Sequence, residues 1–486
     1  MGEKATSKIS LWEAVLPIVV LVVMLGYNVF FVYGDNALNG SNQFILLLGA
    51  AIAVVIGFLN KIPISVMTHE IYNNIKSTSG AILILLFVGA LSGTWLLSGI
   101  IPTMIYYGLQ ILTPAIFLPA CVIICSMVSV AIGSSWTTSA TIGIALVGIG
   151  NSLGIPLGLI GGAIISGSYF GDKMSPMSDT TNLAPVLAGT DIFTHIKYMT
   201  YTTIPTIILT LIIFTIIGLN IDTQGVSDTK AIQEAILERF HVTPWVFVVP
   251  AVILVMIYKK AEPLVALFCG VILGAVFALI FQQKLLLELT QSTSLEFTTI
   301  YQLMMDTITT SSQIPTDNEA LNELFSSSGM SGMLNTIWLI ICAMAFGGVM
   351  EAIGALERIT EFLLNLFSSV FGLFASTVMS CLALNITTSD QYLSLVVPGK
   401  MFSKAYARKG LAPENLSRTL EDSGTVTSVL IPWNTCAAYN SGVLGIPTLT
   451  YLPYAFFNLI SPFMTLIFVA FNIKIRRIFT KEEENS

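Results

Sequence analysis

Two polar stretches interrupt an otherwise apolar chain, and both are rich in carboxylates and hydroxyls. Residues 171–185 read Gly-Asp-Lys-Met-Ser-Pro-Met-Ser-Asp-Thr-Thr-Asn-Leu-Ala-Pro, and residues 421–428 read Glu-Asp-Ser-Gly-Thr-Val-Thr-Ser. Carboxylate, hydroxyl and carbonyl oxygens are the ligands that hard cations take. A carboxylate at the centre of a bilayer costs roughly 2.5–3.5 kcal/mol, so a bound cation, a proton or a basic partner must compensate for it. The two stretches therefore predict ion chemistry.

The candidate cation- and proton-binding side chains come from these stretches and from two further polar turns. They are Asp172, Lys173, Ser175, Asp179, Thr180, Ser134, Thr137, Thr387, Ser389, Asp390, Asp422, Thr425 and Asn434. Within this set, Asp172, Asp179 and Asp422 are predicted to ligate the metal ion, and Lys173 to neutralise Asp172 or Asp179 when no ion is bound. Desolvation can raise the pKa of a carboxylic acid towards neutrality, which lets Na⁺ and protons compete for it. Helix capping is the alternative role for Asp390 and the turn hydroxyls.

The elements that carry these residues must lie in a membrane. Hydrophobic residues make up 54% of the 486 residues, charged residues 10%, and the mean hydropathy is +0.82, whereas a soluble protein carries about 25% charged residues. Several apolar runs reach the roughly 18–25 residues that cross a bilayer, beginning with 16–32, 44–59 and 81–101. We therefore predict an all-α polytopic membrane protein. Its polar stretches would be broken helices, which survive in hydrocarbon only around protected or ion-filled cavities.

The distribution of basic residues predicts the orientation. Of the 21 Lys and Arg residues, 17 fall at one set of loop ends, and the positive-inside rule makes this set cytoplasmic, together with both termini. They are Lys4, Lys8, Lys61, Lys76, Lys197, Lys259, Lys260, Arg358, Lys400, Lys404, Arg408, Lys409, Arg418, Lys474, Arg476, Arg477 and Lys481.

The two halves of the chain repeat one another at an offset of 250 residues. At this offset Asp172 matches Asp422, and Thr137-Thr138-Ser139 matches Thr387-Thr388-Ser389. The first half begins inside and the second outside, which predicts an inverted-topology repeat with sites at broken helices near the midplane. The predicted boundaries are 1–220 for the first repeat (hairpin 113–150, broken helix 156–190), 221–243 for an extracellular connector, 244–478 for the second repeat (hairpin 360–402, broken helix 417–447) and 479–486 for a cytoplasmic tail.

Other chemistries lack their motifs. His69-Glu70 opens like a zinc-protease motif but has no second histidine, and there is no phosphate-binding Gly-x-x-x-x-Gly-Lys loop. An intramembrane aspartyl protease would need a Gly-x-Gly-Asp context that the residues before Asp172 do not provide. The six cysteines form no CxxC pair, so free thiols are expected. We predict no enzyme, no cofactor and no nucleic-acid partner; the lipid bilayer is the expected environment, and a homodimer is left open.

The chain resembles the NhaC-type sodium/proton antiporters over nearly its whole length. The residues that carry the resemblance are the 171–185 string, Gly133-Ser-Ser-Trp136 before it, and Glu421-Asp-Ser-Gly-Thr425 and Pro432-Trp-Asn434 after it. This resemblance implies the fold of the ion transporter superfamily, with inverted repeats, two re-entrant hairpins and elevator-like motion. It also implies secondary exchange of Na⁺, or Li⁺, for H⁺ in a bacterial plasma membrane. A malate–H⁺/Na⁺–lactate exchanger, with Asn182 and Asn434 binding the organic anion, is the family-level alternative, and a passive ion channel is the alternative from another class.

Overall fold

The computed structural model describes residues 9–33, 37, 40–221, 229–292, 294, 296–316, 322, 325–366 and 369–478. The predicted 479–486 tail and part of the 221–243 connector lie outside these ranges. Apart from a short antiparallel pair, β1 (Ser312–Gln313) and β2 (Ser326–Ser327), the named elements are helical. In the described residues, eight helices are long and apolar enough to cross a membrane, or up to ten if each sharply bent pair counts as one span. The predicted all-α polytopic membrane class is confirmed.

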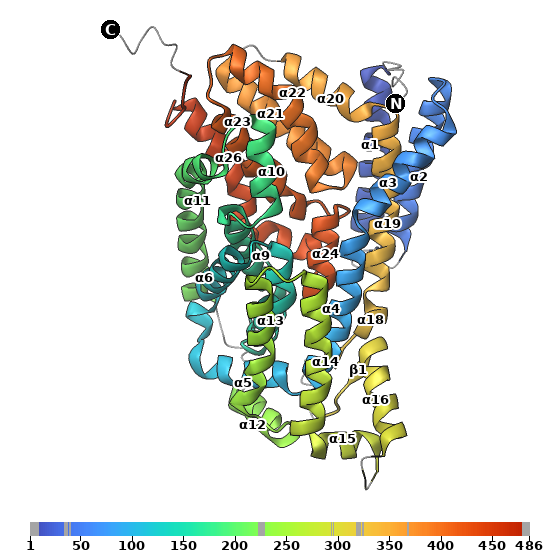
Figure 1. Cartoon of the computed structure of the whole chain (residues 1–486), viewed down its shortest axis with the longest axis vertical. Helices are drawn as coiled ribbons and strands as arrows, with labels where there is room; N and C mark the ends of the chain where they lie inside the picture. Colours follow the sequence, from blue (N-terminus) through green and yellow to red (C-terminus); the bar gives the residue numbers. More distant parts are fainter. Residues whose placement is uncertain are drawn as a thin grey trace.

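The helices lie on either side of the predicted 221–243 connector. The first half contains α1 (Leu11–Tyr27), α2 (Ser41–Leu59), α3 (Ile64–Ser77), α4 (Ser79–Leu97), α5 (Ile100–Ile111), α6 (Pro114–Ile132), α7 (Ser135–Thr138), α8 (Ile144–Ser152), α9 (Leu157–Met174), α10 (Asp179–Ala188) and α11 (Ile192–Asn220). The second contains α13 (Val248–Tyr258), α14 (Pro263–Phe281), α15 (Gln283–Thr290), α16 (Phe297–Thr309), α19 (Leu334–Ala352), α20 (Ala355–Leu366), α21 (Val370–Thr388), α22 (Gln391–Arg408), α23 (Pro413–Leu420), α24 (Thr435–Leu444) and α26 (Phe456–Ala470). The connecting helices α5 and α20 lie at opposite ends of the molecule (Figure 1).

One boundary differs from the sequence-based expectation. The second hairpin begins at Val370, not at residue 360, because 355–366 forms the separate helix α20. The first half contains an equivalent extra helix, α5, before its hairpin. Both α5 and α20 have 12 residues, about 18 Å at 1.5 Å per residue, which is too short to cross the bilayer.

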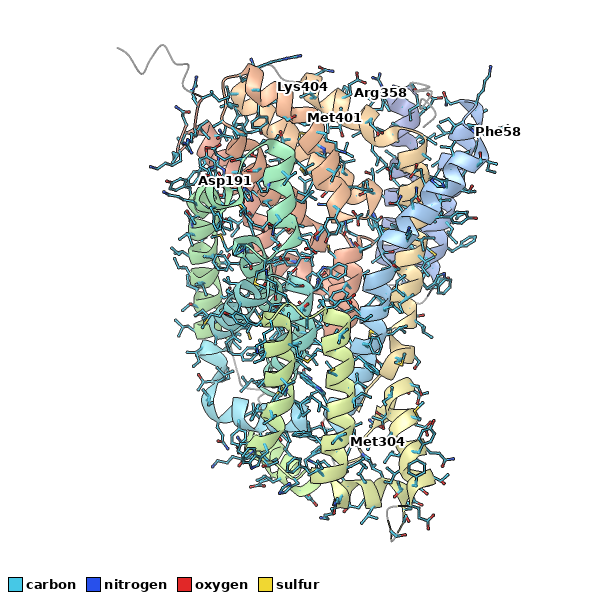
Figure 2. All side chains as sticks on the ribbon, viewed as in Figure 1. Phe58, Asp191, Met304, Arg358, Met401 and Lys404 are labelled. Carbon is cyan, nitrogen blue, oxygen red and sulfur yellow. The ribbon has the colours of Figure 1, made fainter. Side chains whose placement is uncertain are left out.

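Two of the basic residues assigned to the cytoplasmic side, Arg358 and Lys404, lie at one end of the molecule (Figure 2). Figure 2 places Arg358 and Lys404 at the end where α20 and α22 begin or end, and Met304 of α16 at the opposite end. That the basic end faces the cytoplasm remains a prediction from charge.

Close packing of α6 on α9 holds the first hairpin against the first broken helix. A Cβ on Gly167 would lie 2.4 Å from the carbonyl oxygen of Val122, and one on Gly171 would lie 2.5 Å from that of Ser126. Small residues let two membrane helices approach closely, and hydroxyls can then bond across the gap. Ser129 Oγ donates such a bond to the Ser168 carbonyl (2.6 Å). The polar stretch that follows α9 is therefore fixed relative to the hairpin tip.

Candidate ion-binding site

The tips of both hairpins are helix N-caps. In the first, the chain turns at Gly133 (φ +78°), and Ser134 Oγ accepts a hydrogen bond from the Thr137 amide (3.2 Å). In the second, it turns at Ser389 (φ +59°), and Asp390 Oδ1 accepts one from the Leu393 amide (3.0 Å). Each cap satisfies an amide that has no partner within its helix. The predicted capping role of Asp390 is thus present in this state.

The first broken helix has its gap at residues 175–178, where Pro176 interrupts the hydrogen-bond ladder between α9 and α10. Thr181 Oγ1 donates to the carbonyls of Asp172 (3.3 Å) and Lys173 (3.1 Å). These bonds satisfy backbone oxygens that the break has freed, as a membrane interior requires. Ser175 and Thr180 also stabilise the gap, since Ser175 Oγ accepts from the Met177 amide (3.2 Å) and the Thr180 hydroxyl contacts that of Ser178 (3.2 Å).

The second broken helix is held by amide side chains from neighbouring spans. After α23 the chain forms a π-helical turn (Glu421–Thr425) and a 3₁₀ turn (Ser428–Leu430) before α24. Asn385 Nδ2 of α21 donates to the Gly424 carbonyl (2.7 Å), and Asn458 Nδ2 of α26 donates to that of Val426 (2.8 Å). Asn434 caps α24 and donates to Asn385 Oδ1 (3.3 Å). Neither Asn385 nor Asn458 is among the predicted site residues, although each is an amide inside an apolar run.

A fully buried ion pair joins the two broken helices. Lys173 Nζ of α9 donates to Asp422 Oδ1 of the π-helical turn, and neither side chain is exposed. Three hydroxyls complete the surroundings of Asp422: those of Thr202 (2.8 Å), Ser461 (3.3 Å) and Thr465 all donate to its carboxylate. None of these three hydroxyls is among the predicted site residues; they lie in α11 and α26. Their signal would have been Ser and Thr at helical spacing within apolar runs.

Lys173 therefore does not contact Asp172 or Asp179, the partners that the sequence suggested. Adjacent residues on a helix do not face one another, and the last turn of α9 directs Lys173 towards α26 and the π-helical turn. There the ammonium also donates to Ser461 Oγ (3.3 Å) and lies 5.8 Å from the centre of the Phe457 ring.

The predicted position of Arg418 at a cytoplasmic loop end is wrong. The charge pattern predicts that Arg418 lies at a cytoplasmic loop end, but its side chain is fully buried in α23. Its guanidinium carbon lies 4.5 Å from the centre of the Tyr198 ring, a cation–π contact, and none of its three nitrogens makes a hydrogen bond. Glu421, one turn later, is also fully buried and accepts no hydrogen bond of normal length. Both charged side chains, Arg418 and Glu421, are therefore buried next to the break in this helix.

A cavity of about 750 Å³ opens beside the first break and is bordered by both hairpin tips. Its lining includes six of the predicted residues, namely Asp172, Asp179, Asp390, Ser134, Thr137 and Thr180. Asp172 is nearly buried and accepts a hydrogen bond from Ser135 Oγ (2.7 Å), whereas Asp179 is exposed. Trp136 stacks on Tyr439 at the wall, with ring centres 4.2 Å apart. The cavity thus leads from solvent to Asp172, whose neighbour in the chain is Lys173.

The remaining predicted residues lie away from this cavity. Asp422 is behind it, paired with Lys173, and the lining does not include Ser175, Thr387, Ser389, Thr425 or Asn434. Thr387 Oγ1 donates to the Ala383 carbonyl (2.8 Å), while the hydroxyls of Ser389 and Thr425 are buried without a partner. Across the described ranges, no three His, Cys, Asp or Glu side chains come close enough to hold a metal ion. Asp172, Asp179 and Asp422 consequently do not form one set of ligands: the break turns Asp179 outwards, and the π-helical turn carries Asp422 towards α26.

The glycine at the first hairpin tip gives a testable link between the hairpin and the break. A Cβ on Gly133 would meet the backbone of Met177 at 2.7 Å and of Ser178 at 2.9 Å, at a positive φ. We expect Gly133→Ala to lower the free energy of unfolding by about 2–3 kcal/mol, from backbone strain and displacement of residues 177–178. Gly189→Ala is the matched control, since Gly189 has φ +87° with nothing within 4 Å of its Cβ position. Equal thermal stability of the two variants would contradict the proposed contact.

The fold and site define a multi-pass helical membrane protein in which two broken helices meet at a buried ion pair. Residues 167–473, which contain both breaks, match the model of the Na⁺/H⁺ antiporter family. The chain belongs to this family, and the resemblance to NhaC-type antiporters is confirmed.

Characterised relatives extend the similarity along the chain. The Na⁺/H⁺ antiporter NhaC of Alkalihalophilus pseudofirmus is 34% identical over 423 residues, which cover 87% of this chain and 88% of that protein. The malate-2H⁺/Na⁺-lactate antiporter of Bacillus subtilis is 34% identical over 465 residues, 94% of each chain. The arginine/ornithine antiporter ArcD of Halobacterium salinarum is 36% identical over 402 residues, 82% of this chain and 80% of that one.

Proposed function

We propose that this chain exchanges Na⁺ (or Li⁺) for H⁺ across the bacterial plasma membrane by alternating access. The observation that carries the proposal is the buried pair of Lys173 and Asp422, one residue from each broken helix, with three hydroxyls donating to the carboxylate. A carboxylate surrounded by hydroxyls is an oxygen-rich environment suited to a hard cation. In this structure, the ammonium group of Lys173 lies next to the Asp422 carboxylate, in the position that Na⁺ would take.

The balance of buried charge explains why cation and proton would exclude one another. The four fully buried Asp, Glu, Lys and Arg side chains in the described residues are two bases, Lys173 and Arg418, and two acids, Glu421 and Asp422. Without Asp172, which is 7% exposed at the cavity, these four form a neutral set when all are ionised. Adding Na⁺ would leave one uncompensated buried charge, at a cost of several kcal/mol. Release of one proton from the set, for example from the ammonium group of Lys173, removes this cost, so entry of Na⁺ and loss of H⁺ are coupled.

In the proposed motion, the two hairpins and two broken helices slide as one body against the other spans. The tight packing of α6 on α9 supports movement of the first hairpin together with its broken helix. The bond from Ser139 Oγ to Asn440 Oδ1 (2.7 Å) links the first hairpin to the second broken helix. The ion pair would travel within this body and meet solvent on alternate sides.

The alternative substrates are organic anions, as in the relative named a malate-2H⁺/Na⁺-lactate antiporter. The cavity argues against a free dianion because Asp172, Asp179, Asp390 and Glu262 line it, while Lys260 is its only basic lining residue among those described. A negative cleft attracts cations and repels anions. An inorganic cation is therefore the better match to the site.

Purified protein in liposomes with an internal pH dye tests the proposal. Imposing a gradient of Na⁺ or Li⁺ alone should move protons in the opposite direction, because one monovalent charge replaces another. A response that appears only when malate and lactate are also present would select the alternative. Cation flux without any proton movement would indicate a passive channel, and liposomes without protein give the background.

A further inference from the structure

A second cavity, of about 470 Å³, lies at the basic end of the molecule between the start of α11 and the segment that follows α26. Its lining includes Lys197, Lys474 and Arg476 together with the rings of Tyr198 and Tyr201. The ammonium group of Lys474 lies 5.2 Å from the centre of the Tyr201 ring. A neighbouring hollow adds Arg477. Here α11 packs against both α23 and α26 (Figure 1).

Among the described residues, the acids near this cavity are already engaged. Glu414 binds Arg476, with 2.8 Å between Oε1 and the guanidinium nitrogen. Asp191 caps α11 by accepting bonds from the amides of Phe193 (3.1 Å) and Thr194 (2.9 Å). Lys197 and Lys474 are exposed, and no described carboxylate lies within ion-pair distance of either. The cavity therefore carries an excess of positive charge.

The face of α11 below the cavity is apolar and exposed. Residues 197, 201, 204, 208, 212 and 216 follow one another at helical spacing. After Lys197 and Tyr201, this face presents Ile204, Ile208, Ile212 and Ile216, which are 39–57% exposed. Basic and aromatic residues above an apolar stripe match a phospholipid, whose phosphate lies at the interface and whose acyl chains enter the hydrocarbon.

We propose that this cavity, formed by residues 194–201 and 474–476, binds the phosphate headgroup of an anionic phospholipid whose acyl chains lie along α11. The bound lipid would hold the 474–476 segment in place. That segment is tied to α23, because the Arg476 carbonyl accepts bonds from the Ala412 amide (3.0 Å) and Asn415 Nδ2 (2.6 Å). Tyr198 adds a bond from its hydroxyl to Asn415 Oδ1 (2.6 Å). Since α23 leads directly into the turn that carries Asp422, the headgroup would stabilise the entry to the ion site.

Lipid titration of the full-length protein in detergent tests this proposal independently of transport. Native mass spectrometry should show tighter binding of phosphatidylglycerol than of phosphatidylcholine, and phosphatidylglycerol should raise the melting temperature. The Lys197→Gln/Lys474→Gln variant should weaken phosphatidylglycerol binding by roughly fivefold per charge removed, because each basic residue near an anionic surface contributes about 1 kcal/mol. Arg476 stays in place, so its ion pair with Glu414 is kept.

The matched control is Lys400→Gln/Lys404→Gln, which removes the same charge from exposed residues of α22. Lys404 lies at the same end of the molecule (Figure 2). The lipid affinity of this control variant should equal that of the unmodified protein. Equal losses in the two double variants would overturn the proposal, since they would mean a general charge effect. Stabilisation by inorganic phosphate equal to that by the lipid would also overturn it, because the site would then recognise free phosphate without acyl chains.

Discussion

Asp422→Asn is expected to abolish Na⁺-driven proton movement in liposomes and to destabilise the protein. The substitution removes the carboxylate that pairs with Lys173 and accepts hydrogen bonds from three hydroxyls. Removing one partner of a buried ion pair leaves the other charge without compensation, which costs about 3–5 kcal/mol. Thermal unfolding of the purified protein should reveal this loss, and the internal pH dye should report only the background of empty liposomes.

A double variant separates stability from transport. Lys173→Met combined with Asp422→Asn removes both charges, so most of the lost stability should return, because neutral residues of similar size replace a buried pair at little cost. Transport should remain absent, because neither the carboxylate nor the exchangeable ammonium group is present. Exchange by the double variant at the rate of the unmodified protein would disprove the assignment of this pair to the ion site.

The sequence predicted the broken helices because their causes are local. Pro176, Gly424 and the surrounding hydroxyls cannot form a regular apolar span. The 250-residue offset predicts that the halves correspond. The class of protein and the position of both polar stretches followed from these features. The sequence also predicted the hairpin tips, because their Ser, Thr and Asp residues are preferred at the first position of a helix.

The pairing within the site depends on tertiary structure and could not be predicted. Lys173 and Asp422 are 249 residues apart, and only the packing of α9, α11 and α26 decides that they meet. Arg418 illustrates the same limit, because a charge count places it in a loop whereas folding buries it against Tyr198. Asn385 and Asn458 act on carbonyls that are freed by a π-helical turn, a feature without a sequence signature.

Asp172→Asn is expected to reduce exchange to background while leaving stability almost unchanged. Asp172 is the nearly buried carboxylate at the inner end of the 750 Å³ cavity, next to Lys173 in the chain. Asparagine keeps an oxygen that can accept the bond from Ser135, so the free energy of unfolding should fall by about 1 kcal/mol at most. The substitution removes the innermost negative charge of the cavity, so a cation would no longer be attracted from the cavity towards Lys173 and Asp422. Initial rates of proton movement across a range of Na⁺ concentrations measure the effect.

Asp179→Asn is the matched control for this prediction, since Asp179 lines the same cavity but is exposed. Its charge is screened by solvent and salt, so the maximal rate should stay within about a factor of two, with a higher apparent KM for Na⁺ at low ionic strength. If both variants lost exchange equally, the cavity would act only through its total charge. If Asp172→Asn retained full exchange, the path from the cavity to Lys173 and Asp422 would have to be abandoned. The contrast between two carboxylates on one wall thus tests whether position, and not charge alone, makes a residue part of the ion pathway.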